Sequence, residues 1–180
     1  MRVISGKVRG LKLITPPGED TRPTLDRVKE AVFSMILPFI TDAKVLDLFS
    51  GSGALGIESL SRGAQRAVFV DNSIDAINCV RSNVNSAKFT DTSVIVQKNA
   101  IGFLKDNKES FDIIFLDPPY LKNMYTETLE NILENNALSP DGIIVLEYDY
   151  EAVNFKIPND FSIIKEKKYG RVGVMVLKRG

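Results

Sequence analysis

The clearest indication of the fold of this chain is the segment Asp47-Leu48-Phe49-Ser50-Gly51-Ser52-Gly53-Ala54-Leu55-Gly56. Its glycines form a G-x-G-x-x-G pattern, which permits a tight turn and lets a ligand come close to the backbone. An apolar run at residues 45–49 precedes the glycines, and Ile57 and Leu60 follow them with helical spacing. A strand, a glycine turn and a helix in this order indicate the first unit of a doubly wound α/β domain that binds a nucleoside-containing ligand.

The middle of the chain repeats this alternation of strand and helix. Near-continuous apolar runs, which are typical of strands covered on both faces, occur at residues 45–49, 67–70, 94–96, 113–116 and 143–146. Helical spacing follows Ser73, a predicted N-cap, and recurs from Tyr125 to Leu133. We expect a Rossmann-like α/β fold with a mostly parallel sheet, whose ligands bind outside the carboxyl ends of the strands.

Both ends of the chain depart from the alternation. Residues 161–168 and 172–178 flank Tyr169-Gly170-Arg171 and predict a C-terminal antiparallel hairpin, which brings the sheet to seven strands. Residues 2–4 and 11–14 predict a small N-terminal hairpin, and a helix follows from about Thr24 to Leu37. We expect one domain, with an extension over residues 1–42 and a Rossmann-like core over residues 43–180.

Composition limits the class of protein. The chain has 180 residues, of which 44% are hydrophobic and 26% charged, as expected of one globular domain with a real core. No run reaches the roughly 18 apolar residues of a membrane span, and the first residues lack the apolar stretch of a signal peptide. Cys79 is the only cysteine and histidine is absent, which excludes an internal disulfide and the usual histidine metal sites and triads. We expect a cytoplasmic monomer without a metal.

The formal net charge of +0 conceals an uneven distribution. The first 30 residues carry seven Lys or Arg and four Asp or Glu, and the last 20 carry six and one. Arg2, Lys7, Arg9 and Lys12 occur before the first acidic residue. Such a basic segment fits a nucleic-acid phosphate backbone, although an ordinary solvated charge explains any one of these residues.

The acidic residues around the glycines indicate which cofactor is bound. Asp71 comes 20 residues after Gly51, at the end of the second predicted strand, where a carboxylate can accept from both hydroxyls of a ribose. Asp47 lies at the tip of the first strand, where it would oppose a pyrophosphate but can hold a cationic amino group. S-adenosylmethionine has an ammonium and a sulfonium and no phosphate, so Asp47 favours it over a nicotinamide cofactor, whose site would have the same glycines and the same Asp71.

The end of the third predicted strand offers a further cofactor contact. The Asn99 side chain and a backbone N–H near Ala100 could reach the adenine edge, although an asparagine at a helix N-cap is explained by capping alone. The complete set of predicted cofactor-binding residues is Asp47, Phe49, Gly51, Ser52, Gly53, Asp71, Asn72, Asn99 and Ala100.

The tetrapeptide Asp117-Pro118-Pro119-Tyr120 follows the fourth predicted strand. The prolines have no N–H, and Asp117, before a proline, is pushed to an extended conformation, so this segment offers only acceptors. A carboxylate and a carbonyl held beside an aromatic ring suit the binding of an NH2 group on a flat conjugated system. Taken alone, the tetrapeptide is equally explained as a proline turn.

The glycine loop, the acid after strand two and Asp117-Pro118-Pro119-Tyr120 together resemble the class I methyltransferases that act on exocyclic amino groups. Four segments carry a closer resemblance: Arg2-Val3-Ile4-Ser5-Gly6, Arg9-Gly10-Leu11-Lys12-Leu13, Thr21-Arg22-Pro23-Thr24-Leu25-Asp26-Arg27-Val28-Lys29-Glu30 and Phe49-Ser50-Gly51-Ser52-Gly53-Ala54-Leu55-Gly56. They are similar to the RsmD family of bacterial 16S rRNA guanine-N2 methyltransferases. The similarity extends from Arg2 to the closing hairpin.

This resemblance implies S-adenosylmethionine as the methyl donor and one guanine of 16S rRNA, in free RNA or a small-subunit assembly particle, as the substrate. Asp117 and the Pro118 carbonyl would accept the N2 hydrogens, with Pro119 fixing the turn and Tyr120 stacking on the base. The N-terminal extension would bind RNA. The predicted RNA-binding residues are Arg2, Lys7, Arg9, Lys12, Arg22, Thr24 and Arg27.

Other functions share parts of this pattern. DNA adenine-N6 and protein glutamine methyltransferases use the same tetrapeptide, although the chain has no target-recognition domain of a sequence-specific DNA enzyme. A nicotinamide-dependent dehydrogenase fits the glycines and Asp71 but leaves Asp47 and residues 117–120 without a task. A non-catalytic RNA-binding module is the third alternative.

Overall fold

The computed structural model describes residues 1–17, 23–118, 124–151 and 155–180, and all the elements below belong to these ranges. The strands are β1 (Lys44–Asp47), β2 (Arg66–Asp71), β3 (Ser93–Gln97), β4 (Phe111–Leu116), β5 (Leu138–Asp149), β6 (Phe161–Tyr169) and β7 (Val172–Arg179). The α-helices are α1 (Pro23–Met35), α2 (Ala54–Ser61), α3 (Ile74–Ser86), α4 (Ala100–Asp106) and α5 (Met124–Glu134). Two 3-10 turns, η1 (Leu37–Phe39) and η2 (Thr90–Thr92), complete the elements.

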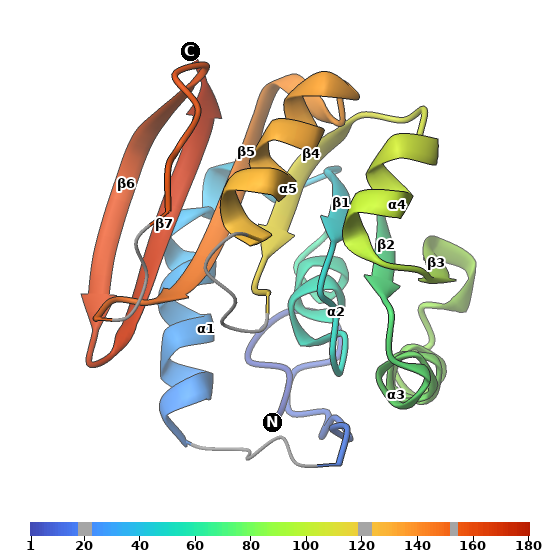
Figure 1. Cartoon of the computed structure of the whole chain (residues 1–180). Helices are drawn as coiled ribbons and strands as arrows, with labels where there is room; N and C mark the ends of the chain where they lie inside the picture. The colour runs from blue at the N-terminus through green and yellow to red at the C-terminus, as the bar shows by residue number, and fades with distance from the viewer. Residues whose placement is uncertain (18–22, 119–123, 152–154) are drawn as a thin grey trace.

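The strands form one seven-stranded sheet in the order β3-β2-β1-β4-β5-β7-β6 (Figure 1). Strands β1 to β5 pair in parallel, while β7 is antiparallel to both β5 and β6. The order reverses between β1 and β4, and in such sheets the crevice at the reversal is where ligands bind. The predicted Rossmann-like fold with a closing antiparallel hairpin is therefore confirmed.

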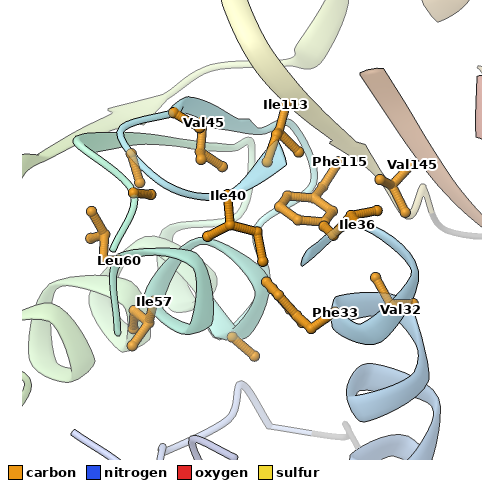
Figure 2. Packing of buried hydrophobic residues seen from close by; sticks show 14 of the residues in the cluster. Val32, Phe33, Ile36, Ile40, Val45, Ile57, Leu60, Ile113, Phe115 and Val145 are labelled. Atoms are coloured by element: carbon orange, nitrogen blue, oxygen red, sulfur yellow. The ribbon is translucent and has the colours of Figure 1, made fainter. Parts of the chain in front are cut away.

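Two hydrophobic layers cover the sheet. Ile113 and Phe115 of β4 join a cluster with α1, α2 and α3, whereas Ile114 and Leu116 join a cluster with α4 and α5. Figure 2 shows the first cluster, where Phe33 of α1 lies 5.8 Å from Phe115 between ring centroids. Burial of each such side chain stabilises the fold by roughly 1.5–3 kcal/mol. The alternation along β4 defines an α1 side and an α5 side of the sheet.

The edges of the sheet differ from the prediction. Val94 of β3 is 43% exposed, so the expectation that residues 94–96 are buried on both faces was wrong. The reason is that β3 is an edge strand, beyond the part of the sheet that the helices cover from both sides. At the other edge, residues 162–168 of β6 are exposed, and the pairing register shifts between Ile163 and Lys165, as in a β-bulge.

The N-terminal segment forms a loose hairpin with a single bridge, between Arg2 and Lys12. Gly6 and Gly10 have φ angles of 87° and 86°, and a Cβ on Gly6 would lie 1.9 Å from the Ser61 carbonyl oxygen. Glycine is therefore required at position 6 for both conformation and space. The predicted helix that follows is confirmed as α1, although it ends at Met35 rather than near residue 37.

In the described part of the chain, no helix combines the length and the hydropathy needed to cross a membrane.

Candidate active site

The predicted site residues gather at the carboxyl ends of three central strands. β1 ends at Asp47, β2 ends at Asp71, and β4 ends at Leu116, directly before Asp117. Asp47 pairs in register with Phe115 of β4, so the cofactor loop and the proline motif start within two residues of each other on neighbouring strands. The order reversal between β1 and β4 thus brings the two halves of the predicted site together.

The glycine loop makes the tight turn that its sequence predicts. Gly51 and Gly53 have φ angles of 51° and 78°, and Gly53 is the N-cap of α2. A Cβ on Gly56 would lie 2.3 Å from the Phe69 ring, so this glycine lets α2 lie directly on β2. The loop therefore presents backbone at the strand ends, as a cofactor site requires.

Asp71 holds the glycine loop from the end of β2. Its Oδ2 accepts from the Gly51 N–H at 2.9 Å, and its Oδ1 accepts from the Ser73 N–H at 2.9 Å. Ser73 in turn caps α3 by accepting from the Ala76 N–H, which confirms the predicted N-cap. The Asp71 side chain remains partly exposed, so it is open to a ligand on the solvent side of the loop.

Asp47 is buried beneath the same loop. Its Oδ2 accepts from the Gly56 N–H at 3.0 Å, and the residue is 2% exposed. Burial raises the pKa of this carboxyl to about 7, an effect that the Gly56 N–H opposes and the charge of Asp71 reinforces. Asp47 thus braces the loop, a task the sequence did not reveal, in addition to any role toward a cofactor.

The loop meets the chemical requirements of a cofactor without phosphate. Residues 47–56 contain two backbone-exposing glycines with positive φ, one acid and no Lys or Arg. The Ser50 hydroxyl is buried and has no hydrogen-bond partner among the described residues, which leaves it available to a bound ligand. Ser50 was missed from sequence because a serine in a glycine loop is explained by the turn alone.

The other predicted cofactor residues occupy different environments. Asn99 is exposed and caps α4, with its Oδ1 accepting from the Gly102 N–H at 2.7 Å, while Ala100 is buried. The capping alternative for Asn99 is therefore confirmed, and its contact to adenine stays a prediction. Phe49 is partly buried against the α5-side cluster, and Asn72 is exposed.

The acceptor motif follows β4. Asp117 is exposed and Pro118 is buried, while Pro119 and Tyr120 lie outside the described residues. On the adjacent strand β5, Glu147 is partly buried, and burial raises the pKa of its carboxyl to about 7. Glu147 was missed from sequence, because its proximity to Asp117 depends on the pairing of β4 with β5.

A pocket of about 440 Å³ lies between the N-terminal hairpin and α1. Its lining includes Arg2, Arg9 and Arg27, three of the predicted RNA-binding residues, together with Asp26 and Glu30. Lys7 and Lys12 are exposed but do not line it. Arg22 and the side chain of Thr24 lie outside the described residues.

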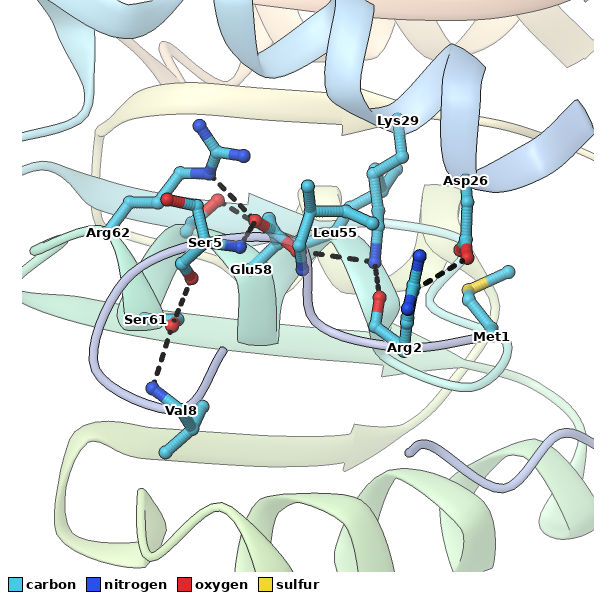
Figure 3. Close-up of polar contacts among 12 residues, drawn as sticks. Met1, Arg2, Ser5, Val8, Asp26, Lys29, Leu55, Glu58, Ser61 and Arg62 are labelled. Atoms are coloured by element: carbon cyan, nitrogen blue, oxygen red, sulfur yellow. Dashed lines mark hydrogen bonds and ion pairs between the residues drawn. The ribbon is translucent and has the colours of Figure 1, made fainter. Parts of the chain in front are cut away.

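A buried glutamate fixes this hairpin to the core (Figure 3). Glu58 of α2 is fully buried and accepts from the Ile4 and Ser5 N–H groups at 2.8 and 3.0 Å. Its carboxylate also pairs with Lys29 at 3.2 Å and with Arg62 at 2.8 Å. The N-terminal hairpin, α1 and α2 therefore share one buried charge network, which we call the Glu58 network.

A second anchor joins the hairpin to the glycine loop. Asn83 of α3 is 2% exposed, and its Nδ2 donates to the carbonyls of Ile14 at 2.8 Å and Ser52 at 2.9 Å. Its Oδ1 accepts from the Ile14 N–H at 2.9 Å. The buried Ser52 also donates its hydroxyl to the Met1 sulfur at 3.9 Å, so the extension contacts the cofactor loop directly.

This seven-stranded sheet, with a glycine loop and two acids at its strand ends, is the fold of a class I methyltransferase. The family model described as "Conserved hypothetical protein 95" matches residues 1–178, and the chain belongs to that family. The resemblance to the RsmD family is thereby confirmed.

Relatives of known sequence and structure span nearly the whole chain. "Ribosomal RNA small subunit methyltransferase D" of Escherichia coli is 35% identical over 99% of this chain and 90% of its own length. "Putative rRNA methyltransferase YlbH" of Bacillus subtilis is 40% identical over 99% of both chains. The solved structure of "Putative methyltransferase yhhF from Escherichia coli" superposes with a TM-score of 0.90 at 35% identity, covering 99% of this chain and 97% of that one.

Proposed function

We propose that this protein transfers a methyl group from S-adenosylmethionine to the exocyclic N2 amine of one guanine in 16S rRNA of the small subunit. Methylation of ribosomal RNA agrees with the names of its relatives. One observation supports an amine as the methyl acceptor. Asp117 and Pro118 follow β4, which is the neighbour of β1, the strand that leads into the cofactor loop. A cytoplasmic location accords with a ribosomal substrate.

The acceptor motif would prepare the amine. The N2 lone pair of guanine is delocalised into the ring, so the free amine is a poor nucleophile. Asp117 and the Pro118 carbonyl would each accept one N–H, which holds the nitrogen in position and increases its electron density. As N2 gains the methyl group its remaining protons become acidic, and Asp117 is placed to receive one and release it to water.

The cofactor would be held by the glycine loop and the two strand-end acids. S-adenosylmethionine, when bound, supplies an electrophilic methyl group and leaves as S-adenosylhomocysteine. Asp71 would accept from the ribose hydroxyls, and Asp47 would favour the ammonium through its charge. The predicted contacts of Phe49, Asn72, Asn99 and Ala100 complete the proposed cofactor site.

The N-terminal extension would hold the RNA. The pocket offers the guanidinium groups of Arg9 and Arg27 for phosphates, together with Arg2, which pairs with Asp26 at 3.5 Å. Lys7 and Lys12 would add charge around it. We propose that Arg22 and Thr24 also bind the RNA. The target guanine must leave its stack to reach Asp117, so an unpaired base costs less than a duplex base.

The test is a transfer assay with labelled S-adenosylmethionine and either free 16S rRNA or small-subunit particles, followed by mapping of the labelled base. We expect label on the N2 of one guanine. Asp117→Ala should reduce transfer by roughly 100-fold or more, because an electrostatic partner in a catalytic site commonly contributes that much. Asp91→Asn, a change of an exposed acid in η2, is the matched control and should leave transfer unchanged.

Three results would contradict the proposal. Label on an adenine or on a protein would overturn the choice of guanine. A chain that binds NADH and ignores S-adenosylhomocysteine would overturn the choice of cofactor. An unchanged rate in Asp117→Ala, with intact binding of S-adenosylhomocysteine, would remove the role of that carboxylate.

A further inference from the structure

We infer that Glu147 is a second carboxylate of the target pocket and selects guanine by accepting a hydrogen bond from its N1–H. This inference rests on the proposed function, because it concerns the base that Asp117 would bind. β4 and β5 pair in parallel, with Phe115 opposite Val145 and Leu116 opposite Leu146. The next residues along the two strands are Asp117 and Glu147, and neighbouring strands lie only about 4.8 Å apart.

The alternation of side chains places both carboxylates on the same side of the sheet. Phe115 and Val145 belong to the cluster on the α1 side, and Leu116 and Leu146 belong to the cluster on the α5 side. Successive residues of a strand point to opposite faces, so positions 117 and 147 return to the α1 side. Asp117 keeps the extended backbone that this argument needs, because it precedes a proline.

Glu147 has no structural task that explains a partly buried acid. In the part of the chain that the structure describes, its carboxylate forms no hydrogen bond or ion pair, although its backbone carbonyl accepts from the Tyr125 hydroxyl at 2.9 Å. Nearby acids differ, since Asp149 pairs with Arg171 at 2.7 Å and Glu166 accepts from the Tyr148 hydroxyl at 2.6 Å. A carboxyl kept partly buried without a partner costs stability, which a functional role would justify.

The chemistry of the purine edge fits two adjacent acceptors. Guanine presents its N1–H and its N2 amine side by side, and both are donors. Adenine and 2,6-diaminopurine carry an unprotonated N1, which would place a lone pair against the Glu147 carboxylate when this group is ionised, above its pKa of about 7. Asp117 would therefore recognise an amine of any purine, and Glu147 would reject those that lack N1–H.

A base analogue tests this division of roles. The RNA fragment that contains the mapped guanine is compared with the same fragment carrying 2,6-diaminopurine at that position, which keeps the 2-amine but loses N1–H. At a pH above about 7, where the Glu147 carboxyl is ionised, we expect the wild-type kcat/KM to favour guanine by about ten-fold or more, the range that one well-made hydrogen-bond pair provides. Glu147→Gln should bring this ratio toward one, because its amide can donate to an unprotonated N1. Glu130→Gln, at an exposed position of α5, is the control and should keep the wild-type ratio.

Two outcomes would overturn the inference alone. The first is a wild-type enzyme that methylates guanine and 2,6-diaminopurine equally well, a result that needs no variant and so does not depend on whether Glu147→Gln folds. The second is an unchanged ratio in a Glu147→Gln protein that still binds S-adenosylhomocysteine. If the wild-type protein places its label on adenine or on no RNA base, the proposed function fails instead.

Discussion

The two basic ends of the chain are attached to the sheet in different ways. At the N-terminal end, Glu58 and Asn83 are buried and hold the backbone of the hairpin through four hydrogen bonds to Ile4, Ser5 and Ile14. At the C-terminal end, the charges of the hairpin lie along the exposed β6 and at the ends of the buried β7, where Lys178 meets Asp141, a residue whose side chain is 99% exposed.

Positive charge alone therefore does not define a binding surface. Buried contacts fix the backbone that carries Arg2 and Arg9 at one position relative to the glycine loop, which suits recognition of a particular RNA shape. Exposed ion pairs at the C-terminal hairpin are weak and easily exchanged, so they suit general attraction to RNA. The predictions below separate these two roles.

The largest effect is expected from loss of the Glu58 network. Glu58→Ala leaves Lys29 and Arg62 without their shared partner, and breaking a buried ion pair from one side costs about 3–5 kcal/mol. The midpoint of thermal unfolding should fall by about 6–20 °C, at 2–4 °C for each kcal/mol in a chain of this size. Asp141→Ala, which removes the pair between a 99% exposed side chain and Lys178, should cost at most about 1 kcal/mol. Equal shifts in the two variants would show that the N-terminal anchor is no stronger than a surface pair.

A smaller effect is expected at the two hairpin turns. Gly6 and Gly170 both have positive φ, but a Cβ would meet the Ser61 carbonyl only at position 6 and has open space at position 170. Gly6→Ala should therefore destabilise the protein by about 1–3 kcal/mol more than Gly170→Ala, the usual cost of overpacking. Denaturant titration of both variants measures this difference, and a smaller loss for Gly6→Ala would contradict the close approach of the turn to α2.

RNA binding should distinguish the two ends by its salt dependence. The double variant Arg9→Ala with Arg27→Ala should reduce the slope of log affinity against log salt by roughly 0.7 for each phosphate that is no longer neutralised. Its KM for RNA should rise while kcat stays near the wild-type value, because under the proposed function these residues would bind RNA away from the reacting atoms. The matched pair Lys167→Ala with Arg179→Ala should change the slope less. A larger change of this slope in the double variant Lys167→Ala with Arg179→Ala would indicate that the hairpin β6–β7, and not the N-terminal extension, carries the specific RNA-binding surface.

The smallest expected effect concerns pH. Burial lowers the pKa of Lys29 below its usual 10.5, although Glu58 partly offsets this. The unfolded chain then binds more protons than the folded one between the lowered pKa and 10.5, so the free energy of unfolding contributed by Lys29 rises with pH in that window. Lys29→Met should flatten this rise, as measured by urea titrations at several alkaline pH values. Lys167→Met, at the exposed end, should leave the profile unchanged.

Sequence patterns sufficed for the parts of the fold that local residues determine. The glycines at 51, 53 and 56 and the acids at 47 and 71 carry their own conformational and chemical signals, and the structure brings them together at the strand ends. The hydrogen bonds between segments that are distant in the sequence could not be predicted from local residue patterns. Glu58 and Asn83 look like polar residues on helix surfaces, yet their partners Ile4 and Ile14 are 54 and 69 residues away.

The same limit applies to the target side of the site. Asp117 was predicted from its proline context, whereas Glu147 emerges only when β5 is known to pair with β4. The prediction that β3 is buried on both faces was also wrong, because an apolar run does not reveal whether its strand lies at the edge of a sheet. Arg22, Pro119 and Tyr120 stay predictions, since they lie outside the described residues.

The register shift in β6 has a consequence for the behaviour of the protein at high concentration. A nine-residue edge strand with exposed Ile163 and Ile164 could recruit the edge strand of a second copy and start aggregation. The bulge between Ile163 and Lys165 interrupts the row of backbone groups beside those isoleucines, and the lysines that follow repel a like-charged neighbour. The edge of the sheet thus carries its own protection against self-association, independent of any RNA that its charges attract.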